Sequence, residues 1–135
     1  MMNFTKLKQK IILKTGFFGI FMGFSTVLGW CQEYELAIWI FMGIATSFYL
    51  NSQLKEFIFT HCIVVGLTWG FDCSLIQTIF IDTYISNHPI IGYEILDITK
   101  YPRILIITIG TTTGLLSGIA LYLPIILLRK IKKID

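Results

Sequence analysis

The sequence predicts an all-α membrane protein, a four-transmembrane-helix bundle with its N and C termini in the cytoplasm. Of its 135 residues, 55% are hydrophobic and only 14% are charged, whereas soluble domains carry about 25% charged residues. The apolar residues also gather in four long runs, and about 20 apolar residues suffice for a helix to cross a bilayer. The charged residues cluster between these runs, as expected for a multi-pass membrane protein.

Each apolar run is expected to form one span of a single membrane domain. The first span covers residues 11–30, which follow a basic start and carry no cleavage site for a signal peptidase. The second covers residues 36–54, although only residues 36–50 are strongly apolar. The third and fourth cover residues 57–81 and 104–128. Short turns join the first span to the second and the second to the third.

Residues 82–103 form the one long connection, on the outer side of the membrane. Pro89 and Pro102 prevent this segment from being a single unbroken helix. Apolar residues such as Ile95 alternate there with charged residues such as Glu94, a pattern that suits a short helix lying in the membrane interface.

The positions of the basic residues predict the orientation. Cytoplasmic segments of membrane proteins carry an excess of lysine and arginine. Nine of the eleven basic residues fall on the side that holds both termini. They are Lys6, Lys8, Lys10, Lys14, Lys55, Arg129, Lys130, Lys132 and Lys133. The other side holds Lys100 and Arg103, so we expect a multi-pass protein of a plasma membrane or a bacterial inner membrane.

The sequence argues against several classes of function. The net charge of +3 comes from residues that flank the spans, so it does not indicate binding to nucleic acid. No phosphate-binding glycine loop, nucleophile elbow or H-E-x-x-H motif is present. His61 and His88 belong to opposite sides of the membrane, so they cannot ligate one haem. We therefore expect no enzymatic activity, no cofactor and no metal.

Glycines repeat at every fourth position in three of the spans, in the manner of a glycine zipper. Such strips let a neighbouring helix approach closely. They are Gly19 and Gly23 in the first span, Gly66 and Gly70 in the third, and Gly110, Gly114 and Gly118 in the fourth. Packing within the bundle accounts for most or all of them, and a homo-oligomer or a membrane-protein partner is the alternative.

Asp72 lies nine residues from the outer end of the third span, near the middle of the bilayer. An acid at that depth is costly wherever lipid reaches it, so we expect Asp72 to point into the bundle. Hydroxyl groups at a similar depth are its expected partners. They are Thr111 and Thr112 in the fourth span, and Thr46 and Ser47 in the second.

Two functions follow from these patterns. The first is a non-enzymatic structural or partner-binding component, embedded in the lipid bilayer, that packs through its glycine strips. The second is a small proton- or cation-coupled transporter, because intramembrane acids often bind protons or cations in transport paths. Asp72 is either a neutral structural acid or the transport carboxylate, and the sequence leaves both roles open.

The charge bias predicts that both chain ends lie in the cytoplasm. Reporter proteins fused at residue 1 and at residue 135 should therefore both report a cytoplasmic location. Reporters on opposite sides of the membrane would contradict the four-span topology, because an even number of crossings leaves both ends on one side.

Overall fold

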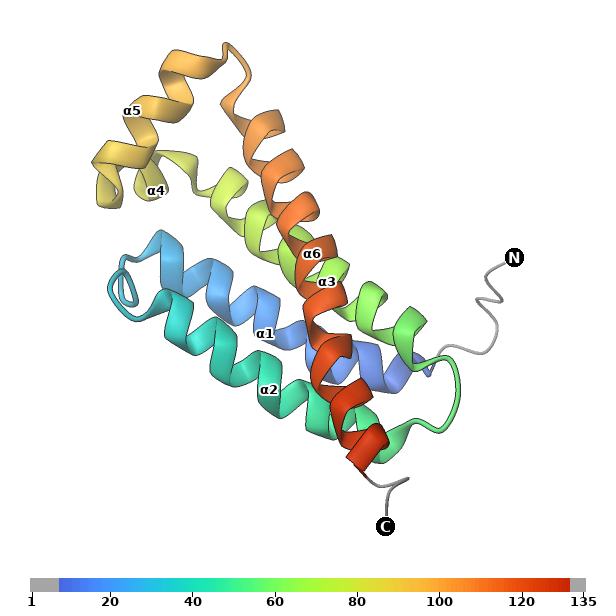
Figure 1. Cartoon of the computed structure of the whole chain (residues 1–135). Coiled ribbons are helices and arrows are strands. Elements are labelled where there is room, and N and C mark those ends of the chain that lie inside the picture. Colours follow the sequence, from blue (N-terminus) through green and yellow to red (C-terminus); the bar gives the residue numbers. More distant parts are fainter. Residues whose placement is uncertain (1–7, 132–135) are drawn as a thin grey trace.

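The computed structural model describes residues 8–131, and this part of the chain is helical without any strand. Four helices are long: α1 (Gln9–Val27), α2 (Glu35–Gln53), α3 (Ile58–Ile79) and α6 (Pro102–Ile131). Two short helices, α4 (Ile81–Asn87) and α5 (Pro89–Ile98), connect α3 to α6. Figure 1 shows α4 and α5 at one end of the molecule and the described chain ends near the other. Lys6, Lys132 and Lys133 lie outside the described residues.

Three helices, α1, α3 and α6, are long and apolar enough to cross a membrane. Many of their large apolar side chains are exposed on the outside of the fold, among them Phe17 (68%) and Leu116 (60%). Such side chains are favourable against lipid and unfavourable against water. This exposure and the three apolar helices agree with a transmembrane protein.

Glycines bring α3 and α6 into direct backbone contact. A side chain at Gly66 would collide with the backbone of Gly114 and Gly118. A Cβ atom at Gly114 would lie 2.5 Å from the carbonyl oxygen of Gly66 and 3.0 Å from the Cα of Gly70. These separations are too short for any side chain, so this helix pair requires glycine on both sides.

Glycines also allow α1 to approach another face of α3 closely. A Cβ atom at Gly19 would lie 2.7 Å from the Cα of Trp69, and one at Gly23 would lie 2.9 Å from the Cβ of Ile76. The indole Nε1 of Trp69 also donates a hydrogen bond of 2.6 Å to the carbonyl oxygen of Thr15. Helix α3 is therefore the central helix, held between α1 and α6.

The buried residues of helix α2 lie in its C-terminal half, and Trp39 of its N-terminal half packs against Phe18 and Trp69. The buried residues are Thr46, Ser47 and Leu50, and the Ser47 hydroxyl donates a hydrogen bond of 2.8 Å to the carbonyl oxygen of Leu121 on α6. Leu121 lies three residues before Pro124 inside α6, in the turn whose hydrogen bonding a helical proline disturbs. The N-terminal half of α2 lies further from α6.

Both terminal helices hold the turn that joins α2 to α3. The backbone N–H of Lys8 donates to Nε2 of the buried His61 at 3.0 Å, and His61 Nδ1 contacts the carbonyl oxygen of Phe57 at 2.8 Å. A neutral imidazole with its proton on Nδ1 satisfies both contacts. From the other side, Arg129 donates to the side-chain oxygen of Asn51 and to the carbonyl oxygen of Leu54.

The segment expected as an outer loop, residues 82–103, consists mostly of α4 and α5. Pro89 occupies the first turn of α5, where its missing N–H is tolerated. Asn87, at the end of α4, donates to the carbonyl oxygen of Val27 at 2.8 Å, and Gln32 donates to the carbonyl oxygen of Asn87 at 2.6 Å. The α4–α5 pair is thereby fixed to the turn between α1 and α2.

The contact between α3 and α6 predicts that Gly114→Leu disrupts the fold. The new side chain would meet backbone atoms that cannot rotate away, so we expect a loss of about 3 kcal/mol or failure to fold. Gly43→Ala is the matched control, because a Cβ there would lie 3.8 Å from Leu121, and its effect should stay within about 0.5 kcal/mol. Thermal unfolding in detergent measures both. A Gly114→Leu protein as stable as Gly43→Ala would contradict the packing described here.

Candidate functional site

Asp72 lies on the flank of α3 that faces α1. A Cβ atom built on Gly16 of α1 would lie 4.0 Å from Oδ2 of Asp72 and 3.0 Å from the side chain of Thr68. Asp72 is half-buried. Among residues 8–131 the Asp72 carboxyl group makes no hydrogen bond and no ion pair.

The hydroxyl groups expected around Asp72 are used elsewhere. Thr111 and Thr112 each donate a hydrogen bond of 2.8 Å to a carbonyl oxygen of their own helix. Ser47 donates to Gly43 and Leu121, and Thr46 is buried on α2. The structure therefore does not bring these four residues together with Asp72 in the part of the chain that it describes.

The angular position of Asp72 around α3 explains why it does not meet α6. Gly70 contacts α6, and Asp72 lies two residues further, or about 200° around the helix. The glycine contact with α6 therefore turns Asp72 away from α6. Matching residues by depth alone carries no information about this rotation.

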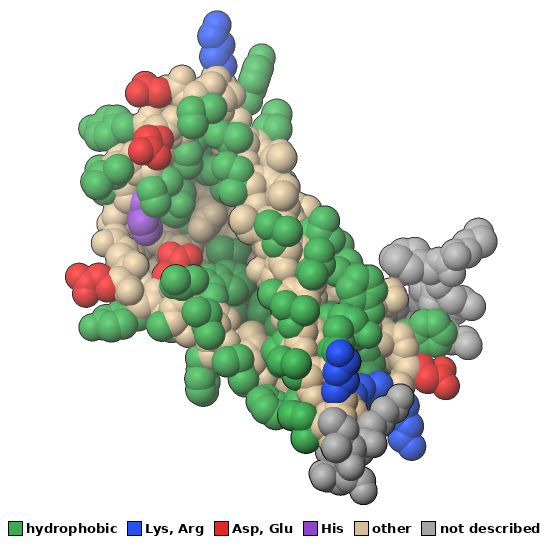
Figure 2. Space-filling view, viewed as in Figure 1, with side chains coloured by type: hydrophobic (Ala, Val, Ile, Leu, Met, Phe, Trp, Pro, Cys, Tyr) green, Lys and Arg blue, Asp and Glu red, His purple; other side chains and the backbone are tan. Residues whose placement is uncertain are grey.

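The main cavity of the described chain is a cleft between α2 and the α3–α6 pair, with a volume of about 720 Å³. Its wide end lies beneath α5, which contributes Ile91, Ile95 and Ile98. Its narrow end lies where Ser47 meets Leu121. Figure 2 shows a hollow on this face, with acidic side chains around it and most basic side chains at the opposite end of the molecule.

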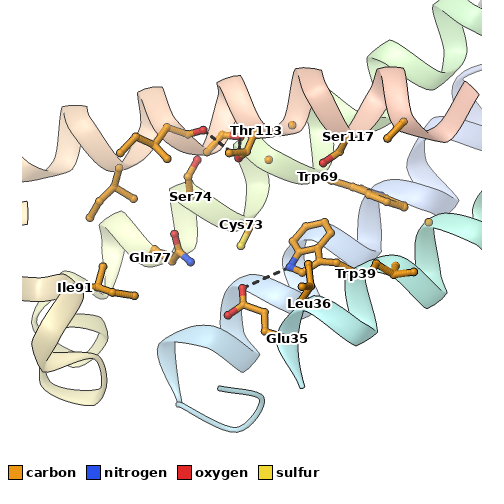
Figure 3. Close-up of a pocket in the computed structure, with 18 of the residues that line it drawn as sticks. Glu35, Leu36, Trp39, Trp69, Cys73, Ser74, Gln77, Ile91, Thr113 and Ser117 are labelled. Atoms are coloured by element: carbon orange, nitrogen blue, oxygen red, sulfur yellow. Dashed lines mark hydrogen bonds between the residues drawn. The ribbon is translucent and has the colours of Figure 1, made fainter. Parts of the chain in front are cut away.

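The cleft wall is mostly apolar, with a few polar groups. Helix α3 contributes Cys73, Ser74 and Gln77, and α6 contributes Thr113 and Ser117 (Figure 3). The hydroxyls of Ser74 and Thr113 donate to backbone carbonyls of their own helices. This is how helical hydroxyls are normally satisfied in apolar surroundings.

Glu35 and Trp39 stand together on α2 at the wide end of the cleft. Trp39 Nε1 donates a long hydrogen bond of 3.4 Å to Oε1 of Glu35, one helical turn away (Figure 3). The Trp39 ring lies 5.8 Å from that of Trp69, and Phe18 packs edge-on against both rings. An aromatic cluster thus lines the cleft beside a carboxyl group.

Tyr84 of α4 also lines the cleft and is half-buried. Burial raises the pKa of the Tyr84 phenol, and the nearby carboxylate of Glu35 raises it further. Glu94 of α5 also lines the cleft and is exposed.

Residues 8–131 contain no group of three histidine, cysteine, aspartate or glutamate side chains placed to hold a metal ion. Cys62 and Cys73 are buried free thiols, and Cys31 is a free, half-buried thiol. The side chains that line the cleft are mostly apolar and aromatic, with a few hydroxyl and carboxyl groups.

Sequence reasoning did not find the cleft or its key residues, Glu35, Trp39 and Trp69. A usable signal was present, because Glu35 and Trp39 are four residues apart and must share a helix face. The second signal was that α2 has a single glycine, Gly43, and therefore no glycine strip with which to pack tightly.

Comparison of the chain with protein-family models, with curated proteins and with solved structures gave no significant match.

The surroundings of Asp72 predict that Asp72→Leu does not weaken the fold. No described hydroxyl depends on the carboxyl group, and removing a polar group from a membrane span is favourable, so we expect a stability gain of about 1 kcal/mol. Ser47→Ala is the contrasting variant, because it removes the hydrogen bond to Leu121 and should cost about 1 kcal/mol. Thermal unfolding in detergent compares the two. A marked loss of stability in Asp72→Leu would indicate a structural partner for Asp72.

Proposed function

We propose that this chain is a non-enzymatic, four-span component of a cell membrane that binds an amphipathic molecule of the bilayer in the cleft. The cleft itself carries this proposal. Its volume of about 720 Å³ falls within the range of about 300–1,000 Å³ that is typical of ligand sites. Its apolar wall with a few convergent polar groups is also the usual composition of such sites.

In this proposal α2 is the fourth span and both chain ends are cytoplasmic. Helix α2 has 19 residues, as many as α1, and runs antiparallel beside it (Figure 1). The basic residues Lys8 and Arg129 meet at the turn between α2 and α3. Acidic residues and α4–α5 occupy the opposite end, so the positive-inside rule assigns the Lys8–Arg129 end to the cytoplasm.

The glycine strips support a structural role more than a partner-binding one. Their close contacts lie within the chain, between α1 and α3 and between α3 and α6. A partner or a second copy would therefore have to use another surface. The cleft is the surface that combines depth with polar groups.

The cleft predicts that the protein binds single-chain amphiphiles from the bilayer. In nanodiscs, amphiphiles with a brominated chain should quench the fluorescence of Trp39 and Trp69, measured in a Trp30→Phe background that removes the exposed indole. Ser117→Phe should reduce quenching, because the phenylalanine ring would occupy part of the cleft. Leu116→Phe is the matched control, because Leu116 points outward and is 60% exposed. Equal quenching in both variants would refute binding in the cleft.

Proton- or cation-coupled transport through Asp72 is the second candidate function. The observation that favours it is that Asp72 lies half-buried within an apolar helix, with no hydrogen bond inside the described chain. Such an acid is free to take up and release a proton or a cation.

The transport function predicts that Asp72→Asn folds normally and abolishes a proton-linked flux. The amide keeps the size of the side chain and removes its titration. Fluxes in proteoliposomes under an imposed pH gradient measure this effect. A flux that persists in Asp72→Asn would exclude the residue from the transport path.

A further inference from the structure

We propose that the cleft selects amphiphiles with a positively charged head, which would lie beside Glu35 and Trp39 while the apolar tail runs along α2 and α6. This inference rests on the proposed function, in which the cleft is a binding site for amphipathic molecules. It adds the charge of the ligand and its orientation in the cleft.

The charge of the cleft is the first observation. The charged residues among the described residues that line it are Glu35 and Glu94, and both are acids. Neither forms an ion pair within the described chain. Glu35 also helps to raise the pKa of Tyr84, which lines the same cleft. A cationic head would be attracted there, and an anionic head would be repelled.

The aromatic rings are the second, independent observation. Trp39 is half-buried and lines the cleft one turn from Glu35. The indole face attracts cations through its electron density, and aromatic side chains are the usual recognition elements for quaternary ammonium groups. Phe18 and Trp69 hold the Trp39 ring by edge contacts at 5.1 Å and by a tilted contact at 5.8 Å. The ring therefore presents a fixed surface to the head group.

The shape of the cleft orients the ligand. Glu35 lies at the wide end, and the hydrogen bond between Ser47 and Leu121 holds α2 against α6 at the other end. Apolar side chains line the cleft between these two ends. They are Leu36, Ile40 and Ile44 of α2 and Ile109 of α6. These side chains are 72%, 56%, 46% and 51% exposed, in that order, so a tail lying among them would cover apolar surface. A head at the wide end and a tail toward the narrow end match this taper.

A transmembrane helix of a second copy is the competing occupant. With its side chains a helix is about 10–12 Å wide along its whole length. Helices α2 and α6 instead meet at the hydrogen bond between Ser47 and Leu121 and diverge toward α5 (Figure 1), which suits a molecule with a broad head and a thin tail. The experiment below therefore includes a test for a second copy.

The test uses full-length protein with Trp30→Phe, at one copy per zwitterionic nanodisc, and three amphiphiles with the same ω-brominated undecyl chain. Their heads are trimethylammonium, a neutral alcohol and a carboxylate. The cation should quench tryptophan fluorescence at a concentration about tenfold lower than the neutral alcohol does, the combined effect expected of a carboxylate and an indole face. The anion should quench least. A non-brominated cation of equal length should reverse the quenching.

Two variants assign the effect to Glu35. Glu35→Gln should remove most of the tenfold preference and leave quenching by the neutral alcohol unchanged. Glu33→Gln is the matched control, because Glu33 is an exposed acid two residues away that does not line the cleft. It should keep the preference. If Glu35→Gln does not fold, Trp39→Leu tests the same site. It removes the indole face and should reduce the preference for the cation.

The remaining outcomes separate the two proposals. Equal quenching by all three heads would overturn the charge selection and leave the cleft as an amphiphile site. No quenching by any amphiphile would overturn both proposals. Quenching by the cation that disappears when two copies share a nanodisc would show that a second copy fills the cleft, and it would overturn the assignment of the cationic amphiphile as its occupant. An unchanged preference in Glu35→Gln would overturn the role of Glu35.

Discussion

The backbone contact between α3 and α6 is the constraint on which the other packing depends. Inside a bilayer, helices gain little from hiding apolar surface from one another, so close packing and hydrogen bonds decide which helices associate. The glycines of α3 and α6 allow backbone atoms to meet, and those of α1 do the same on the other flank of α3. Three helices are thereby fixed together without help from α2.

The cleft is a consequence of this unequal packing. Helix α2 has a single glycine, Gly43. A Cβ atom there would lie 3.8 Å from the side chain of Leu121, which is an ordinary contact distance. The helix is held instead by hydrogen bonds near its C-terminus, from Ser47 to α6 and from Lys8 and Arg129 to the turn that follows. Toward its N-terminus α2 keeps contact with α1 and α3 through Trp39 but diverges from α6 (Figure 1), and this divergence leaves the wide end of the cleft.

The sequence predicted the helical class and the close packing of the glycines because both depend on local patterns. Apolar runs indicate helices in a bilayer, and glycines four residues apart share one face. The environment of Asp72 was not predicted, since it depends on how α3 is rotated. That rotation was in fact implied by the glycine strip: if Gly70 contacts α6, Asp72 cannot, because it lies about 200° further around the helix. The single glycine of α2 indicated looser packing of this helix, but the position and volume of the cleft were not predictable, because it arises from a gap between elements rather than from any one of them.

Helices α4 and α5 cover one end of the cleft. Asn87 and Gln32 fasten this pair to the turn between α1 and α2, and α5 lies over the wide end with Ile91 and Ile95 on the wall. The gap between α2 and α6 is bordered by exposed apolar side chains such as Ile40 and Ile109. In the proposed function, a molecule dissolved in the bilayer would meet this lateral gap directly. If α2 is a span, as proposed, Glu35 at its start would lie near the interface, so lateral entry would bring an amphiphile in with its head beside this residue.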